Sequence, residues 1–201
     1  AFANTLSGSF DGTDDYLSVT DVPALDTASA LTFSFWGKPA ASGKSLGMES
    51  LISSTDKIIL YLWYTNVVYF GVRNGGSPSA ASQAFTADGN WHHICGTYDG
   101  STGTIKLYID GSLVSTQTGA PSTTSDLSGN FVVGKSGGSD YNEGLIDEVA
   151  IFNSALSASD VTAIYNSGTP DDLSGYSPLH WWRFGDGTGD VNASGGTPAN
   201  T

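Results

Sequence analysis

The chain has 201 residues and carries 20 acidic against 7 basic side chains, a formal net charge of −13 at pH 7. Nucleic acids and anionic lipid surfaces attract basic proteins, so this balance argues against both as partners. No apolar run reaches the roughly 18 residues of a membrane-spanning helix. The single cysteine, Cys95, excludes an internal disulfide and a cysteine-based zinc cluster.

Most of the chain consists of short β-like runs separated by Gly, Ser, Asp and Asn. Many short strands with turn residues at this spacing are typical of sandwiches and barrels. Asp110-Gly111 adds the positive φ angles that a tight hairpin turn needs. The expected strands are 16–20, 31–38, 50–53, 58–64, 67–73, 91–98, 104–109, 113–118, 130–134 and 145–152.

One helix is expected after these strands. Ser157 and Asp160 resemble a capping box, with Asp in the place of the usual Glu. Val161 and Ile164 follow at helical spacing, and Gly168 supplies a helix-ending residue. The pattern predicts a short helix at the edge of the sandwich.

The hairpin between 58–64 and 67–73 gives an assignment of faces. A two-residue turn at Thr65-Asn66 pairs Tyr61 with Phe70, and residues that pair share a face. We assign the more uniformly apolar face to the core. It carries Ile59, Tyr61, Trp63, Val68, Phe70 and Val72.

The opposite face of this hairpin carries Tyr64, Tyr69 and Arg73 and is the predicted ligand-binding surface. Pyranose rings have apolar faces and hydroxylated edges, so a sugar site combines an aromatic ring with hydrogen-bonding groups. Two alternatives stay open. The chain's own loops or the segment 181–184 could cover this face, or ligands could bind at the loop tips.

Three stretches carry a family resemblance. They are 9–17, which reads Ser-Phe-Asp-Gly-Thr-Asp-Asp-Tyr-Leu, 91–111, which begins Trp-His-His-Ile, and 144–157, which begins Gly-Leu-Ile-Asp-Glu-Val. Together they resemble the laminin-G-like, concanavalin A-like jelly-roll domains over about 10–168. The resemblance implies an all-β fold of two antiparallel sheets packed face to face. It also implies a glycan- or protein-binding module, often with a calcium ion at its rim.

The resemblance places one domain at 1–170 and leaves 171–201 as a separate segment. This segment contains Trp-Trp-Arg-Phe and continues to Gly187, a stretch similar to the motif that opens other members of the family. Either the segment packs back onto the sandwich, as in a permuted domain, or it begins a following module. The same stretch is similar to segments of structural proteins of tailed phages.

The acidic residues suggest a calcium site, because Ca²⁺ takes six to eight oxygen ligands. Asp11 and Asp14 lie in one Gly-containing loop. The first and last strands of a jelly roll often lie side by side, which would bring Asp147 or Glu148 close. We therefore predict Ca²⁺ held by Asp11, Asp14 and Asp147. The alternative is that Asp shapes turns throughout a chain with 17 Asp and 3 Glu.

Catalytic residues are not expected. A glycosidase on this fold needs two nearby carboxylates. Asp147 and Glu148 are adjacent, so in a regular strand they point to opposite faces, as do His92 and His93. The two histidines therefore cannot bind one metal ion together, and packed or hydrogen-bonded histidines are expected.

These observations predict an all-β jelly-roll sandwich with one short helix and no enzymatic activity. The predicted function is glycan binding or adhesion, with calcium dependence as a further expectation, outside the cell or on a virion surface. Single sugar sites are weak, so a homo-oligomer or a tandem chain would add avidity. The alternative is a structural virion protein, a capsid decoration or tail spacer, that contacts only other protein subunits.

Overall fold

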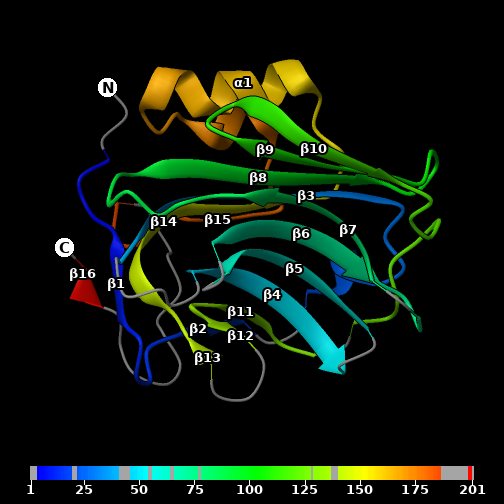
Figure 1. Cartoon of the computed structure of the whole chain (residues 1–201), viewed down its shortest axis with the longest axis horizontal. Coiled ribbons are helices and arrows are strands. Elements are labelled where there is room, and N and C mark those ends of the chain that lie inside the picture. The colour runs from blue at the N-terminus through cyan, green and yellow to red at the C-terminus, as the bar shows by residue number, and fades with distance from the viewer. Residues whose placement is uncertain are drawn as a thin grey trace.

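The computed structural model describes residues 4–19, 22–40, 46–53, 56–63, 66–76, 78–127, 129–136, 140–186 and 199–200. Figure 1 shows two curved sheets packed face to face, with one helix outside the upper sheet. All strand pairs in these sheets are antiparallel. The predicted all-β jelly-roll sandwich is thus confirmed.

The larger sheet has eight strands. Its order is β10 (Ser112–Thr118), β9 (Thr104–Ile109), β8 (His92–Asp99), β3 (Ala30–Pro39), β14 (Glu143–Phe152), β1 (Gly8–Asp11) and β16 (Ala199–Asn200), and β15 (His180–Trp182) also pairs with β14. Asp110 and Gly111 have φ angles of 50° and 72°, as predicted for the turn between β9 and β10.

The smaller sheet has six strands. Its order is β2 (Leu17–Val19), β11 (Phe131–Val133), β4 (Leu46–Ser53), β5 (Asp56–Trp63), β6 (Val67–Arg73) and β7 (Ser79–Ala84). A separate two-stranded ribbon is formed by β12 (Lys135–Ser136) and β13 (Asp140–Tyr141).

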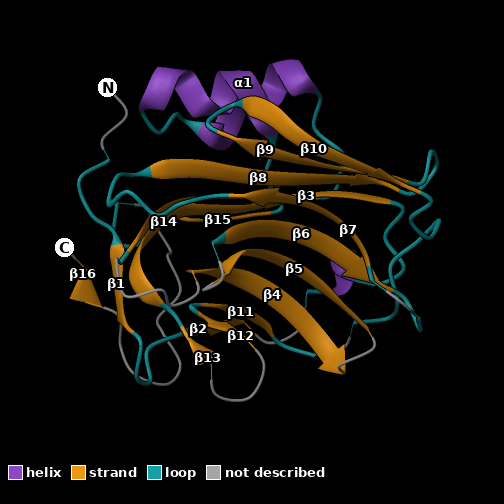
Figure 2. Ribbon diagram, viewed as in Figure 1, coloured by secondary structure: helices purple, strands orange, loops and turns teal. Residues whose placement is uncertain are grey.

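Helix α1 (Ala158–Tyr165) lies against the outer face of the eight-stranded sheet (Figure 2). The predicted capping box is present, because Ser157 accepts from the Asp160 amide and Asp160 accepts from the Ser157 amide. Val161 packs against Cys95 and Tyr108, and Ile164 packs in a second cluster on the same face. Short 3-10 turns lie at η1 (Pro23–Leu25), η2 (Asn166–Gly168) and η3 (Leu173–Tyr176). No helix in the described ranges is both long and apolar enough to cross a membrane.

The core between the sheets is rich in aromatic rings. Phe33 of one sheet meets Phe70 and Phe131 of the other, with ring centroids 6.2 and 5.7 Å apart. Trp182 of β15 lies parallel to Phe131 at 5.5 Å and is almost fully buried. Residues 171–186 therefore pack back onto the sandwich, and the division of the whole chain into domains stays a prediction.

The predicted register between β5 and β6 is wrong by one residue. Trp63 pairs with Val67, so three residues separate the strands, and Asn66 has a left-handed φ of 60°. Tyr61 consequently lies opposite Tyr69 instead of Phe70. Because side chains alternate between faces, a slip of one residue exchanges the two faces of β5.

Because of this slip, the predicted assignment of faces is wrong for β5 and correct for β6. Ile58 and Leu60 face the core, and the predicted core residues Ile59 and Tyr61 lie on the outer face instead. The β6 assignment is correct, because Val68, Phe70 and Val72 belong to the core cluster. Tyr69 and Arg73 therefore do lie on the outer face, as predicted.

The close approach of the sheets at Gly96 can be tested by adding one carbon. A Cβ there would lie 2.2 Å from Cγ of Phe70. We expect Gly96→Ala to lower the free energy of unfolding by about 3 kcal/mol, measured by urea denaturation. Gly76→Ala is the control, since its Cβ would have only Asn74 O nearby, at 3.8 Å. Equal effects of the two substitutions would contradict this account of the core.

Candidate functional site

The outer face of the six-stranded sheet carries an aromatic ring beside two cations. The ring of Tyr69 lies over Gly71, because a Cβ on that glycine would be 2.6 Å from Tyr69 Cε1. Arg73 lies two residues beyond Gly71 on the same face and pairs directly with Lys57 of β5. Burial raises the pKa of Tyr69, and the charge of Arg73 opposes this effect. Tyr64, the third predicted binding residue, lies outside the described residues.

Part of this outer face is covered. Tyr61 is buried, and its hydroxyl donates a hydrogen bond to the Lys135 carbonyl of β12. The two-stranded ribbon thus lies over the β4–β5 side of the sheet. On the β6–β7 side, Tyr69 and Arg73 are half-buried and Ser82, which pairs with Tyr69, is exposed. Of the predicted binding face that the structure describes, the β6–β7 side is therefore the open part.

A β-bulge in β14 forms a second polar site. Asp147 pairs with Trp36 and Ala150 pairs with Ser34, so β14 advances three residues while β3 advances two. Glu148 takes a left-handed φ of 50° within the bulge. The expectation that Asp147 and Glu148 face opposite sides is wrong, because the extra residue turns both away from the core.

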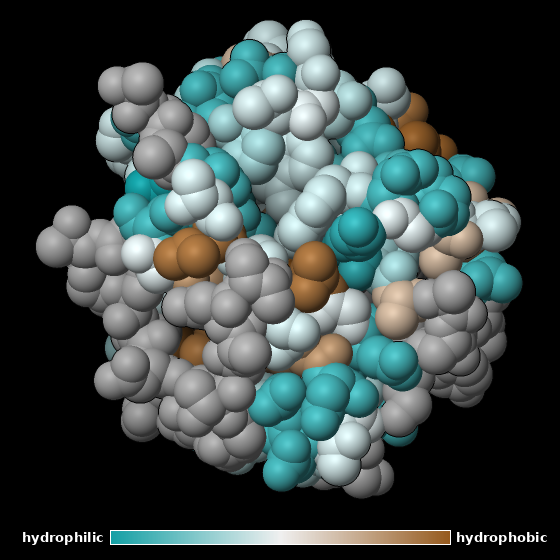
Figure 3. Space-filling model, turned by 90° about the vertical axis from the view of Figure 1, so that its left-hand side faces the viewer, coloured by the Kyte–Doolittle hydropathy of each residue, from teal (hydrophilic) through white to brown (hydrophobic). Residues whose placement is uncertain are grey.

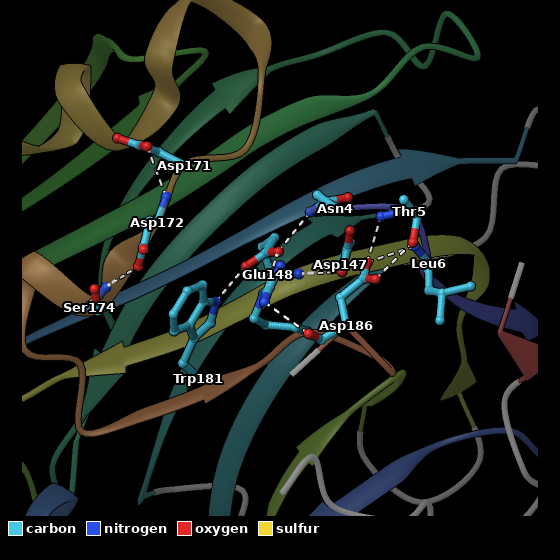
Figure 4. A network of polar contacts seen from close by, with 11 residues as sticks. Asn4, Thr5, Leu6, Asp147, Glu148, Asp171, Asp172, Ser174, Trp181 and Asp186 are labelled. Carbon is cyan, nitrogen blue, oxygen red and sulfur yellow. Dashed lines mark hydrogen bonds and ion pairs between the residues drawn. The ribbon is translucent and has the colours of Figure 1, made fainter. Parts of the chain in front are cut away.

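Glu148 joins three parts of the chain. Its carboxylate accepts hydrogen bonds from Asn4 Nδ2 at 2.6 Å, from Trp181 Nε1 and from Arg183 Nε at 3.2 Å. Figure 4 shows this carboxylate between the N-terminal segment and the segment that carries Trp181. Burial raises the pKa of Glu148, and these donors counteract part of the rise. The residue is therefore a buried, well-bonded anchor.

Asp147 has fewer compensating partners. Its Oδ1 accepts from the Glu148 amide at 2.8 Å, and 3% of the residue is exposed. Burial raises its pKa to about 7, and the neighbouring charge of Glu148 adds to the rise. Asp186 lies close enough to act in the same direction, while its own carboxylate accepts from the Thr5 and Leu6 amides.

Asp147 also lines a pocket of about 120 Å³ on the outer side of the eight-stranded sheet. The other described lining residues are Trp36, Trp91, Gly168 and Pro170. Trp91 is 37% exposed, which is unusual for so large an apolar side chain. The pocket therefore combines a buried carboxylate with two indole rings.

The predicted calcium ligands are not brought together. Asp11 and Asp14 lie at the β1–β2 turn, and Asp11 pairs with Glu143. Asp147 lies four residues beyond Glu143 in β14, which is about 13 Å at the rise per residue of a strand. Asp11 instead accepts from the Thr13 amide, which shapes the turn. Among the described residues no group of three His, Cys, Asp or Glu side chains could hold a metal ion. Calcium binding by this chain stays a prediction.

The two histidines behave as expected of strand histidines. His92 bonds to Asp110 at 2.8 Å and to Asp88 at 3.0 Å. His93 is buried, bonds to Ser34 at 2.8 Å, and has its pKa lowered to about 4 by burial.

The pocket and the bulge were not predicted from the sequence. The sequence does contain a signal for the bulge, because its apolar residues Ile146, Val149 and Ile151 all face the core and are not evenly spaced by two. A strand that keeps these three inside needs one extra residue, which falls at Asp147-Glu148.

Comparisons with known proteins agree with this architecture. A family model described as the concanavalin A-like lectin/glucanases superfamily matches residues 11–162. Comparison with curated proteins found no match. Similar solved structures include a heptameric SAP-like pentraxin from Limulus polyphemus, with a TM-score of 0.67, 18% identity, and coverage of 98% of this chain and 94% of that one.

Two further structures are similar. The CBM40 of the Ruminococcus gnavus IT-sialidase, solved with α2,3-sialyllactose, has a TM-score of 0.65 and 16% identity, and covers 81% of this chain and 99% of that one. Domains LG4-5 of the mouse laminin α1 chain have a TM-score of 0.60 and 15% identity, with 77% and 44% covered. At these identities the likeness shows the fold.

Replacing Asp147 tests its electrostatic environment. A carboxyl whose pKa rises from 3.8 to about 7 on folding stabilises the protein at low pH, and this contribution is lost as pH rises through that window. We expect Asp147→Asn, which carries no charge, to gain stability relative to the unmodified protein by roughly 3 kcal/mol between pH 5 and pH 8. Urea denaturation at both pH values measures this change. A stability difference that does not vary with pH would contradict the burial of an ionisable Asp147.

Proposed function

Because the chain belongs to the concanavalin A-like lectin/glucanase superfamily, we propose that it is a non-catalytic glycan-binding module. Its sugar-binding surface is the open part of the six-stranded sheet, around Tyr69 and Arg73. The placement of the Tyr69 ring over Gly71, beside Arg73, carries this proposal. A ring held along the sheet gives the apolar face of a pyranose a surface to stack on, and Ser82 adds an exposed hydroxyl at its side.

The charges on this face favour an acidic sugar. Lys57 and Arg73 are direct cross-strand neighbours, and like charges in that position repel one another. They are two of only seven basic residues in a chain of net charge −13. An anionic substituent bound here would meet both positive charges. The similar CBM40 structure was solved with a sialylated sugar, whose carboxylate has this chemistry.

A groove of about 380 Å³ beside β8 and β9 is less suited to stacking a sugar ring. Its described lining consists mainly of hydroxyl and charged side chains, among them Thr97, Asp99 and Lys106, and includes no aromatic ring. Sugar binding there would depend on hydrogen bonds that water also offers.

Several features support the absence of catalysis. Glycoside hydrolysis uses two carboxyl groups on either side of the scissile bond. Among the described residues that line the pocket with Trp36 and Trp91, Asp147 is the one carboxylate. The neighbouring Glu148 is bonded to Arg183, Asn4 and Trp181. Glu143, the other candidate, pairs with Asp11 at the end of β1.

The surface supports a sugar partner over a broad protein interface. Among described residues, the exposed large apolar side chains are Trp91 and Leu113. Figure 3 shows one end of the sandwich with its apolar residues in separate areas between hydrophilic ones. Stable interfaces between proteins usually need a larger apolar patch. We further propose display outside the cell, with several copies supplying avidity. Display on a virion and dependence on calcium are finer forms of this proposal.

A glycan array tests the proposed surface. We expect acidic oligosaccharides to bind and neutral analogues to bind about tenfold more weakly. Tyr69→Ala should abolish binding through loss of the stacking surface, whereas Tyr69→Phe should retain most of it. Arg73→Ala should remove the preference for acidic sugars.

Two control variants lie on other surfaces: Tyr176→Ala for the tyrosine and Lys106→Ala for the cation. Each array is repeated with EDTA to test the calcium prediction. Silence across the array together with stable oligomers in solution would favour the structural alternative. Measurable cleavage of polysaccharides would contradict the non-catalytic assignment.

A further inference from the structure

We propose that the pocket formed by Trp36, Trp91 and Asp147 binds an organic ammonium group. This site lies on the outer face of the eight-stranded sheet, whereas the proposed sugar surface lies on the outer face of the other sheet. The two proposals therefore stand or fall separately.

The pocket is built from secondary structure on three sides. Asp147 and Trp36 are direct cross-strand neighbours in β14 and β3. Trp36 stacks on Tyr165 of α1, with centroids 5.8 Å apart and planes at 18°, so its indole is fixed. Gly168 and Pro170 come from the turn that follows α1, and Trp91 precedes β8. Asp147 and Trp36 are therefore held in place before any ligand arrives.

The charges around the pocket call for a cation. The negative charges of Glu148 and Asp186 both act on Asp147 here. The nearby guanidinium of Arg183 bonds to Glu148 Oε1 and to the Asp186 carbonyl. The buried imidazole of His93, whose ring centroid lies 5.4 Å from that of Trp36, has its pKa lowered to about 4 and is neutral at pH 7. This group of side chains consequently carries more negative than positive charge.

Two indoles and a carboxylate are the groups that recognise ammonium ions. The face of an indole attracts a cation through its quadrupole, most strongly where water is excluded. A carboxylate adds an ion pair, and Asp147 is 3% exposed. Burial and the neighbouring charge of Glu148 raise its pKa to about 7, although hydrogen bonds from the Glu148 amide and from Asn4 oppose the rise. A bound cation would stabilise the ionised form.

The size of the pocket limits the ligand. Its volume of about 120 Å³ equals that of roughly four water molecules. A methylated ammonium head, the amino group of an amino sugar or the end of a lysine side chain would fit, whereas a whole pyranose ring would not.

The test compares a cation with a neutral molecule of similar shape. Tetramethylammonium and tert-butanol are titrated into the protein at pH 8 while tryptophan fluorescence and the amide NMR spectrum are recorded. We expect millimolar binding of the cation, at least tenfold tighter than that of the alcohol, with shifts at Trp91 and Asp147. Glucosamine and N-acetyl-lysine amide then distinguish a sugar-borne from a peptide-borne amine.

Variants and pH assign the effect to Asp147. Asp147→Asn should weaken cation binding at least tenfold, while Asp126→Asn, which removes an exposed carboxylate elsewhere, should not. Trp91→Ala tests the pocket independently, because this residue is partly exposed and its loss does not open the core. Binding to the unmodified protein should be about tenfold weaker at pH 6 than at pH 8, because protons compete for Asp147.

Three results would overturn the proposal. They are equal affinity for the cation and the alcohol, cation binding that survives both Asp147→Asn and Trp91→Ala, and no binding at about 50 mM. A glycan array without binding would contradict the proposed sugar surface and not this proposal, because the two sites lie on different sheets.

Discussion

The central strands of this sandwich bury one face against the other sheet, and this constraint decides which side chains can meet a partner. Side chains alternate strictly along a strand, so a change of one residue in register or in strand length moves a side chain from the core to the outside. The protein uses both devices. The three-residue connection between β5 and β6 sets one outer face, and the bulge in β14 sets the other.

The bulge gives two neighbouring acidic residues different environments. Glu148 is neutralised by Arg183 and bonded to Asn4 and Trp181, so it ties the N-terminal segment, β14 and β15 into one unit. Asp147 accepts a hydrogen bond from the Glu148 amide, is also bonded by Asn4, and lines a pocket. The two carboxylates have the same chemistry, but hydrogen bonds and an opposite charge offset the burial of Glu148 more fully than that of Asp147.

The fold could be predicted from the sequence because local signals agreed with the global pattern. The Asp110-Gly111 turn, the capping box at Ser157 and the alternation in 67–73 each predicted a feature that the structure contains. Strand β7 was missed because its sequence, SAASQA, contains no large apolar residue, and only Ala81 of it reaches the core. Tertiary pairing with β6 makes this segment a strand, and such pairing cannot be inferred from local propensity.

The candidate sites were harder to predict, because they depend on contacts between distant segments. Tyr69 and Arg73 lie on the predicted outer face despite the wrong pairing with β5, because alternation within β6 does not depend on that register. The pocket needs Trp36, Trp91 and Asp147, which no local pattern brings together. The predicted calcium ligands failed to assemble because Asp11 pairs with Glu143, a register that only the folded sheet reveals.

The most direct test of the account is to map a bound sugar by amide NMR. An acidic oligosaccharide that binds on the array would be titrated into labelled protein. We predict shift changes concentrated in β6 and β7, at Tyr69, Arg73 and Ser82, with the outer face of the eight-stranded sheet unchanged. Shift changes confined to the eight-stranded sheet or to loop tips would contradict the assignment of the open six-stranded face as the sugar-binding surface.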